Sequence, residues 1–530
     1  MAVNKQRLVK TGIWQVSNTV VVILSQIIGN AIIVRYVSPQ EFGVMAITNT
    51  FINFASFISE AGMGDALMQR RENDLEPQHK NAALYFSFLF SCALYLVLFF
   101  AAPYIASIYP DATVNNEPVL IPALRVLGIS FILLALGSSS LNLLMKRFNF
   151  KTIFFSDSLT LLLSNVLGVV LAMKGWGVWS LVYSILFYNL ARLIMVWFFE
   201  PIPVFLGAKL RHWKDLFAYG VGLTLVRFYN FVSGFGIILL IGKLVGTEQT
   251  GVYDRSYRIT NIPVRYLGDM IQKILMPFMV KINDENEKLF AFFYRGMAFS
   301  NALLVPISVF AIVFCQPIVT ILLGPKWHSA VIPMQILFLS LPFRITTKVA
   351  DVLMRAKNLV FKNANRKLQY IIVLCIGILL CSKWGLIGIT SAVTGAAVFN
   401  YVFMLLTIKR HVFQKGWQKL IINPFKDGLF ISLITVLPSW GIYWLLNQFI
   451  KEGWLSFSIL CVLLGIFFSY AFFKKPGLLG PDFAEVQKQL IKMVRKKGKG
   501  QGKGNGKGKR RKNNIAQQEN DTADIAQVTE

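Results

Sequence analysis

The sequence predicts an all-α polytopic membrane protein, and three observations support that fold class. Of the 530 residues, 55% are hydrophobic and only 15% are charged, whereas soluble domains carry about 25% charged residues. The mean hydropathy is +0.55. Many stretches of about 20 residues carry few or no charges, and a helix of that length crosses a hydrocarbon core of about 30 Å. Such a chain has too little polar surface for an ordinary soluble protein.

The apolar stretches predict about fourteen transmembrane helices. The second, eighth and tenth are the least apolar, and the eleventh is short. The predicted spans are 12–34, 43–67, 82–105, 121–144, 152–173, 177–199, 218–242, 257–279, 291–314, 329–353, 367–382, 385–408, 426–446 and 454–473.

The distribution of lysine and arginine orients these spans. With the N-terminus in the cytoplasm, the cytoplasmic segments carry about three times as many basic residues as the outer segments, in agreement with the positive-inside rule. Both termini are therefore expected in the cytoplasm. The outer loops are short, which disfavours a folded domain outside. The outer cations are Arg35, Lys174, Lys243, Arg255, Arg258, Lys326, Lys383 and Lys451.

Two similar corners, YVSPQEFGVM at 36–45 and LVGTEQTGVY at 244–253, indicate an internal repeat. They follow the first and the seventh spans, so six spans separate equivalent points and both copies have the same orientation. This pattern predicts two parallel six-helix lobes, a transporter architecture. At a separation of 208 positions the identical pairs are Gly12/Gly220, Ser25/Ser233, Ile33/Ile241, Val37/Val245, Gly43/Gly251 and Val44/Val252.

The repeat sets the predicted domain boundaries. The N-lobe covers 1–205, the C-lobe 206–410 and two extra helices 411–475. Residues 476–530 form a basic cytoplasmic tail in which lysine alternates with glycine, a composition that cannot bury a core and predicts disorder. The tail is interpreted as a solvated segment that reinforces the orientation. Contact with anionic lipid headgroups is an alternative, and no nucleic-acid partner is expected.

The N-terminal motifs resemble one family of transporters. The S-P-x-x-F-G corner at 38–43 and the A-G-x-G-x-A-L run at 61–67 are similar to those of the multidrug/oligosaccharidyl-lipid/polysaccharide (MOP) exporter superfamily, and most similar to its Wzx-type polysaccharide export proteins. The resemblance covers about residues 1–475. It implies two six-helix lobes around a central cavity that opens alternately to each side. It also implies a substrate, a polyprenyl pyrophosphate bearing an oligosaccharide repeat unit for surface polysaccharide or lipopolysaccharide.

Cations inside the spans are the candidate substrate-binding residues. A charge in the hydrocarbon core is costly and usually faces the interior of the bundle. Arg227 and Arg344 are deep in their spans and have no acidic residue three or four positions away. A pyrophosphate accepts hydrogen bonds from arginine in a forked geometry, which fits the substrate that the resemblance implies. The full candidate set is Arg227, Arg344, Arg265, Lys348 and Arg192.

Other interpretations of these charges stay open. Arg265 and Asp269 stand at i,i+4 and could form an internal pair, and Lys348 and Arg355 could be cytoplasmic anchors. Arg125, Asp65 and Asp157 are shallow enough to reach the interface. The acidic residues Glu60, Asp269 and Asp351 are candidates for ion coupling or gating.

Motifs of enzymes are missing from the sequence, so no catalytic residue, metal site or cofactor is predicted. Na⁺ and H⁺ are the candidate coupling ions. The expected partners are the lipid-linked oligosaccharide, membrane lipids and polysaccharide-assembly proteins, and the expected location is the bacterial inner membrane. A cation-coupled multidrug antiporter is an alternative, disfavoured because arginine and lysine dominate the candidate site. A membrane polysaccharide polymerase or ligase is another, disfavoured by the short outer loops.

Overall fold

The computed structural model describes residues 5–60, 77–114, 116–147, 149–202, 236–413, 417–450 and 455–464. In these ranges the elements are helices, apart from a hairpin of two-residue strands, β1 (Thr113–Val114) and β2 (Glu117–Pro118). The predicted all-α fold class is thereby confirmed. The candidates Asp65 and Arg227 lie outside the described residues, as do the whole of the predicted tail at 476–530 and the A-G-x-G-x-A-L run.

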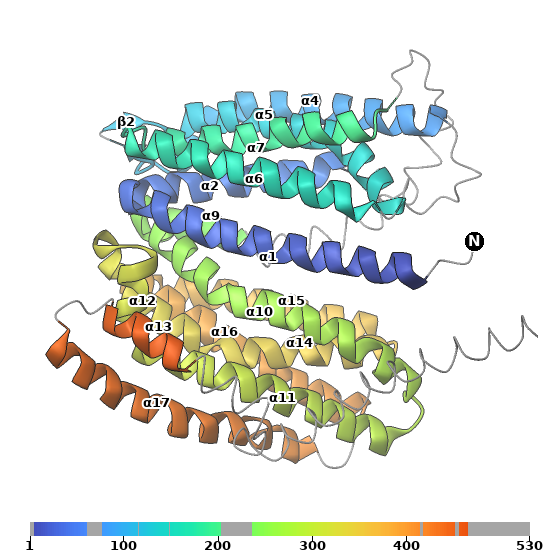
Figure 1. Ribbon diagram of the computed structural model, residues 1–530, viewed down its shortest axis with the longest axis vertical. Helices are drawn as coiled ribbons and strands as arrows, with labels where there is room; N and C mark the ends of the chain where they lie inside the picture. Colours follow the sequence, from blue (N-terminus) through green and yellow to red (C-terminus); the bar gives the residue numbers. More distant parts are fainter. Residues whose placement is uncertain are drawn as a thin grey trace, which may run out of the picture. The chain divides into compact units, whose positions relative to one another are not determined.

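The first six predicted spans agree with helices of the structure. The helices pack in neighbouring pairs, α1 with α6, α4 with α5, α5 with α7 and α6 with α7 (Figure 1). The helix α2 contacts both α4 and α5. Their bounds are α1 Lys5–Tyr36, α2 Pro39–Glu60, α4 Pro77–Ile108, α5 Leu120–Lys146, α6 Phe150–Met173 and α7 Val178–Phe199.

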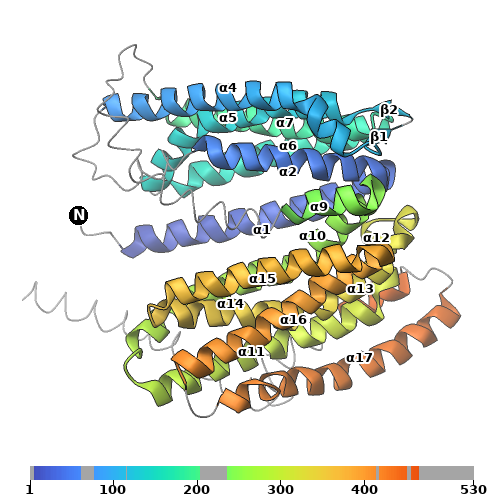
Figure 2. The same ribbon diagram turned by 180° about the vertical axis from the view of Figure 1, so that it is seen from behind.

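The second half of the chain continues with helices that Figure 2 labels from the opposite side. Their bounds are α9 Gly236–Val245, α10 Thr247–Lys281, α11 Asn286–Val313, α12 Cys315–Leu322, η2 Pro325–Ala330, α13 Val331–Leu339, α14 Leu341–Ala356, α15 Val360–Cys381, η3 Ser382–Trp384, α16 Gly385–His411, η4 Trp417–Leu420, α17 Asn423–Phe449 and a last apolar helix Leu455–Leu464.

Two helices differ from their predicted spans. The helix α10 begins at Thr247, ten residues before the predicted start at 257, so Arg255 and Arg258 lie in a helix and not in a loop before it. Their position on the outer side stays a prediction. The tenth span is a broken helix, in which η2–α13 and α14 meet at an angle of 41°. The break falls at Ser340, two residues before Pro342, and proline cannot continue the helical hydrogen bonding of the preceding turn.

Among the described residues, eight helical segments are long and apolar enough to cross a membrane, or nine if the bent pair is one span. One segment, Phe361–His411, contains both α15 and α16. The helix α10 is not among these segments, in line with the prediction that the eighth span is one of the least apolar. The total of fourteen spans stays a prediction.

The chain forms two compact units, each with its own apolar core. Unit 1 comprises 1–265, 311–341 and 364–400, and its core contains Phe42, Phe131 and Trp327, all fully buried. Unit 2 comprises 266–310, 342–363 and 401–530, and its core contains Phe293. The N-lobe and C-lobe at 1–205 and 206–410 stay predictions.

Candidate functional site

The two repeated corners lie against each other in unit 1. A Cβ atom added at Gly43 would stand 1.8 Å from the carbonyl oxygen of Thr247, and one added at Gly251 would stand 1.9 Å from the carbonyl oxygen of Pro39. Pro39 and Thr247 are themselves separated by 208 positions. The contact is therefore reciprocal: each corner places its glycine on the carbonyl of the other, where no side chain fits.

The first corner also holds the start of α7. The carboxylate of Glu41 accepts a hydrogen bond from the backbone N–H of Ser38 at 2.7 Å and another from Val178 at 3.1 Å. The Ser38 hydroxyl in turn accepts the N–H of Glu41 at 3.3 Å. These bonds satisfy donors that helix N-termini leave without intrahelical partners, and a negative charge is favourable there.

The second corner approaches its own half of the chain in the equivalent place. The side-chain oxygen of Gln249, which corresponds to Glu41, lies 3.5 Å from where a Cβ at Gly385 would stand. Gly385 corresponds to Gly177, and both have positive φ angles, +61° and +51°. The dipeptide Trp-Gly precedes α7 and recurs at the start of α16 with the same separation of 208 positions. This second signal of the repeat lies outside the corners that the sequence comparison aligned.

Two aromatic residues, one from each half of the chain, form hydrogen bonds with the backbone of the other half. Tyr109, after α4, donates its hydroxyl to the carbonyl of Leu239 in α9 at 3.1 Å. Trp327, in η2, donates its indole N–H to the carbonyl of Val34 in α1 at 3.2 Å. Burial raises the pKa of Tyr109 to about 12, so its hydroxyl remains a donor at physiological pH. These bonds join α9 and the last turn of α1 to the opposite half.

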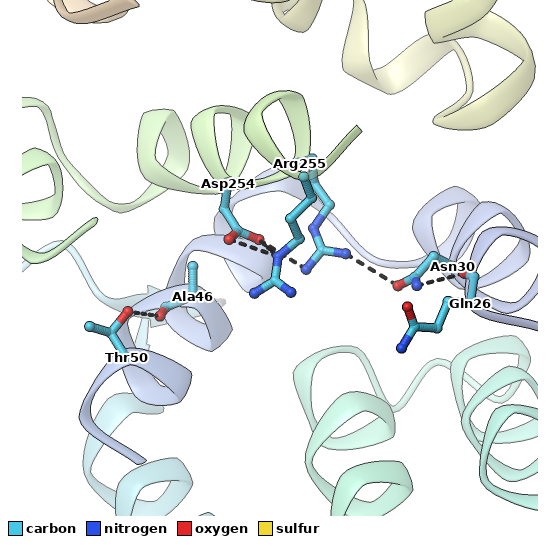
Figure 3. A network of polar contacts seen from close by, with 7 residues as sticks. Gln26, Asn30, Ala46, Thr50, Asp254 and Arg255 are labelled. Carbon is cyan, nitrogen blue, oxygen red and sulfur yellow. Dashed lines mark hydrogen bonds and ion pairs between the residues drawn. The ribbon is translucent and has the colours of Figure 1, made fainter. Parts of the chain in front are cut away.

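A buried ion cluster lies beside the corners (Figure 3). Asp254 on α10 binds Arg255 at 3.0 Å and accepts Arg258 through both carboxylate oxygens, at 2.8 and 2.9 Å. Arg255 also donates to the side-chain oxygen of Asn30 on α1 at 3.2 Å, and Asn30 donates to the carbonyl of Gln26 at 2.7 Å. The Asp254 side chain is 3% exposed and that of Arg255 11%. A charge this deeply buried requires such compensation.

The Arg255 side chain also contacts an aromatic ring. Its guanidinium carbon lies 4.2 Å from the ring centre of Phe42 on α2, a cation–π geometry. The Phe42 ring also packs edge-on against Trp327, with 5.4 Å between the two ring centres. The corner region thus combines backbone contact, aromatic packing and a compensated charge.

A second charged pair joins α6 and α7 in unit 1. Arg192, a predicted substrate-binding residue, donates to Asp157 at 2.7 Å. Asp157 also accepts a hydrogen bond from the amide of Asn18 on α1 at 3.3 Å. Arg192 lies 5.9 Å from the ring centre of Tyr188. The side chain of Asp157 is 14% exposed and is held by these two contacts.

A polar face joins α10 and α14 in unit 2, defined here as Asp269, Gln272, Lys348 and Arg355. Lys348 binds Asp269 at 2.8 Å, and these side chains are 28% and 53% exposed. Gln272 donates to the carbonyl of Lys348 at 3.1 Å and accepts from Arg355 at 3.3 Å. Gly268 leaves room for the lysine stem, since a Cβ there would stand 2.5 Å from the Lys348 Cδ.

Three further predicted residues lie on α10 and α14. Arg344 and Asp351 on α14 are half-buried, Arg265 on α10 is exposed, and Arg355 Nε donates to the carbonyl of Asp351 at 3.2 Å. Glu60 is the last residue of α2. The structure thus brings Asp269 and Lys348 together, which sequence spacing did not pair.

Sequence reasoning missed the buried role of Asp254 and Arg255. It counted Arg255 as an outer-loop cation because the span was predicted to begin at 257. A usable signal was present: Asp254 and Arg258 stand at i,i+4 close after the second corner. Asn30, near the outer end of the first span, gave no comparable signal.

Sequence comparisons relate the chain to polysaccharide biosynthesis proteins. The profile of the family described as "Polysaccharide biosynthesis protein" matches residues 8–332. The lipopolysaccharide biosynthesis protein WzxC of Escherichia coli is 23% identical over 446 residues, 81% of this chain and 86% of that protein. The succinoglycan biosynthesis transport protein ExoT of Rhizobium meliloti is 23% identical over 299 residues, 56% of this chain. That match spans 59% of the length of ExoT, less than two thirds.

Structure comparisons show the fold. The lipid II flippase MurJ in an inward closed conformation superposes with a TM-score of 0.66 at 13% identity, over 87% of this chain and 99% of that one. An inward-facing multidrug resistance transporter of the MATE family, of the MOP superfamily, gives a TM-score of 0.54 at 16% identity, over 73% and 94%. Since the family profile covers more than half of the sequence, the chain belongs to the polysaccharide biosynthesis protein family, with the polytopic helical fold of MOP exporters.

Proposed function

We propose that this protein flips polyprenyl-pyrophosphate-linked oligosaccharide repeat units from the cytoplasmic to the outer leaflet, by alternating access, for cell-surface polysaccharide biosynthesis. The observation that carries the proposal is the family match over residues 8–332. The relatives named for succinoglycan transport and lipopolysaccharide biosynthesis support this substrate class. The fold shared with a lipid II flippase is compatible with it.

The proposal includes the setting of the protein. It is a multi-pass membrane protein, and we place it in the bacterial inner membrane with both termini in the cytoplasm, on the basis of the basic cytoplasmic loops. Its partners are the lipid-linked oligosaccharide, membrane lipids and polysaccharide-assembly proteins. Transport rather than catalysis is the proposed activity, with Na⁺ or H⁺ as coupling ion and Glu60, Asp269 and Asp351 as candidate coupling residues.

The cations of α14 are proposed to receive the pyrophosphate. Arg344 and Lys348 stand one helical turn apart on one face of α14, and Lys348 is 28% exposed while bound to Asp269. An anionic headgroup could therefore exchange with the Asp269 carboxylate at Lys348. Arg265, Arg192 and Arg227 complete the proposed set, and Arg192 would have to leave Asp157 to take part.

A reconstituted flipping assay tests the proposal. The purified protein is placed in liposomes with a fluorescent polyprenyl-pyrophosphate-linked sugar, and a membrane-impermeant quencher reports the label that reaches the accessible leaflet. Arg344→Ala should slow flipping at least about tenfold, the equivalent of one charge-assisted hydrogen bond of about 1.5 kcal/mol. Arg344→Lys should lie between Ala and wild type, because lysine keeps the charge and loses the forked geometry.

Lys362→Ala is the matched control, because Lys362 is an exposed cation of α15. It should flip at the wild-type rate. If the wild-type protein does not flip the lipid but exports a cationic dye in the same liposomes, the multidrug antiporter replaces the proposed function. If it lengthens or transfers the glycan, the polymerase or ligase alternative does.

A further inference from the structure

The contact between the corners is limited by backbone atoms on both sides. Gly43 meets the Thr247 carbonyl and Gly251 meets the Pro39 carbonyl, and a Cβ at Gly251 would also stand 2.7 Å from the backbone nitrogen of Gly43. Backbone atoms in the first turns of α2 and α10 are fixed by the helix, whereas a side chain can adopt another rotamer. The approach of the two helices is therefore possible only with glycine at both positions.

Each corner is tied to its own half of the chain. Glu41 holds the start of α7 through Val178, and Gln249 lies beside Gly385 at the start of α16. Thr247 and Gly251 can thus move with the second half while Pro39 and Gly43 move with the first. The reciprocal contact is a surface along which the two halves can part without rupture inside either one.

The buried charge is arranged to survive such a separation. Arg255 makes two contacts to the first half, its hydrogen bond to Asn30 and its stacking on Phe42. Its acidic partner Asp254 is the adjacent residue on the same helix, and Arg258 also binds Asp254. Parting of the halves would break the contacts to Asn30 and Phe42 but leave the arginine paired with Asp254. No uncompensated buried charge results from the movement.

We propose that the Gly43–Gly251 contact is the closing surface of this end of the protein: the end opens when the two corners separate, and a side chain at either glycine holds it open. The inference rests on the alternating access of the proposed function and assigns residues to it. Its test needs no substrate, so failure of this contact is distinguishable from failure to flip the lipid. With the predicted topology this end faces outward, so the described arrangement of unit 1 is closed on the outer side.

Cysteine accessibility tests the inference in the purified full-length protein. The five native cysteines are replaced by alanine or serine, and Ile47→Cys is introduced as the reporter. Ile47 is fully buried, and its Cδ1 lies 3.1 Å from where a Cβ at Gly242 of the other half would stand. Tyr36→Cys, at a position 48% exposed, gives the rate for an open site. The label is a hydrophilic maleimide.

Gly43→Ala and Gly251→Ala should each raise the labelling rate of the Ile47→Cys reporter by about tenfold or more, because they remove the closed state from an equilibrium whose open state is minor. Gly395→Ala is the matched control: it also adds a methyl group inside a helix, but no atom lies within 4 Å of the new Cβ. It should leave the rate unchanged.

Phe42→Leu gives a second measurement that adds no volume at the glycines. It removes the ring between Arg255 and Trp327 and should raise labelling by a smaller factor than the glycine variants. Size-exclusion chromatography identifies variants that have lost the fold. If both glycine variants have lost it, the labelling rate of Phe42→Leu alone tests the proposal. Wild-type labelling in folded Gly43→Ala and Gly251→Ala would overturn the proposal, as would a response at one glycine and not at the other. Wild-type labelling in Phe42→Leu would do the same if the glycine variants do not fold.

Discussion

The corner region of unit 1 and the polar face of unit 2 both join cations to an aspartate, under opposite conditions of burial. Asp254 is 3% exposed and binds two arginines, one of which also meets an amide and an aromatic ring. Asp269 is 53% exposed and binds Lys348, itself 28% exposed. A buried ion pair is costly to break, whereas an exposed pair exchanges with water at little cost. The first suits a structural contact and the second a surface that binds a charged ligand.

The glycines of the two regions also differ in which atoms would meet an added Cβ. At Gly43 and Gly251 the atoms nearest to an added Cβ belong to the backbone. At Gly268 the nearest atom is a methylene of the Lys348 side chain, which can adopt another rotamer. Tolerance to substitution should therefore separate the two regions, and the following predictions measure that separation.

The largest difference is expected between Asp254→Asn and Asp269→Asn. The first keeps the shape of the side chain but removes the charge that compensates Arg255, at a cost of about 3–5 kcal/mol in the free energy of unfolding. The second breaks an exposed pair and should cost less than about 1 kcal/mol. Unfolding by sodium dodecyl sulfate in mixed micelles measures both. Equal losses for the two variants would show that burial does not distinguish the regions.

Tyr109→Phe should have an intermediate effect, because it deletes one buried hydrogen bond of the corner region. The expected loss is about 1 kcal/mol at pH 7. The pKa of Tyr109 is raised from 10.0 to about 12 by burial, so the tyrosine contributes its full stability below pH 10 and loses it as the pH rises toward 12.

The difference between wild type and Tyr109→Phe should therefore be constant up to about pH 10 and shrink above it, since phenylalanine does not ionise. Unfolding midpoints at several pH values provide the measurement. Tyr104→Phe is the control: Tyr104 is 74% exposed, and its substitution should change the midpoint little at any pH. A difference that grows above pH 10 would contradict the raised pKa that burial gives Tyr109.

The sequence predicted most helices because apolar length alone determines whether a segment can cross a membrane. It also predicted the repeat, because Gly43 and Gly251 are kept at matching positions. It could not predict that the corners touch each other, since the pairing of two repeats is a property of their packing. The start of α10 was misplaced because its first turns are polar, and Asp254 and Arg255 satisfy each other in a way that hydropathy does not register.

The candidate binding residues show the same limit. Arg192 and Lys348 lie in helices, and their partners Asp157 and Asp269 come from neighbouring helices. Their role in binding substrate stays a prediction. Spacing along one helix favoured Asp269 with Arg265 because only i,i+3 and i,i+4 neighbours are visible in a sequence. Contacts between helices depend on which faces meet, and small residues such as Gly268 decide how closely they do.

The smallest effect on stability is expected for Gly268→Ala. The added Cβ would meet the Lys348 Cδ at 2.5 Å and the Ile345 Cδ1 at 3.1 Å, both in side chains. Rotation of the lysine relieves the first contact, and alanine favours the helix by roughly 0.8–1 kcal/mol relative to glycine. These terms nearly offset each other, so the unfolding midpoint in mixed micelles should stay close to that of wild type. Flipping should nevertheless slow several-fold, because the displaced lysine loses its position beside Asp269.

The double variant Gly268→Ala with Lys348→Met separates the two effects. Methionine lacks the ammonium group and adapts its shape to the new methyl group, so the collision disappears while the gain in helix propensity remains. The double variant should unfold at or above the wild-type midpoint and flip no better than Lys348→Met alone. A loss of stability in Gly268→Ala as large as that in Gly251→Ala would mean that α10 and α14 are packed as rigidly as the corners. The polar face would then belong to the framework of unit 2, and its charges could not exchange partners with a headgroup.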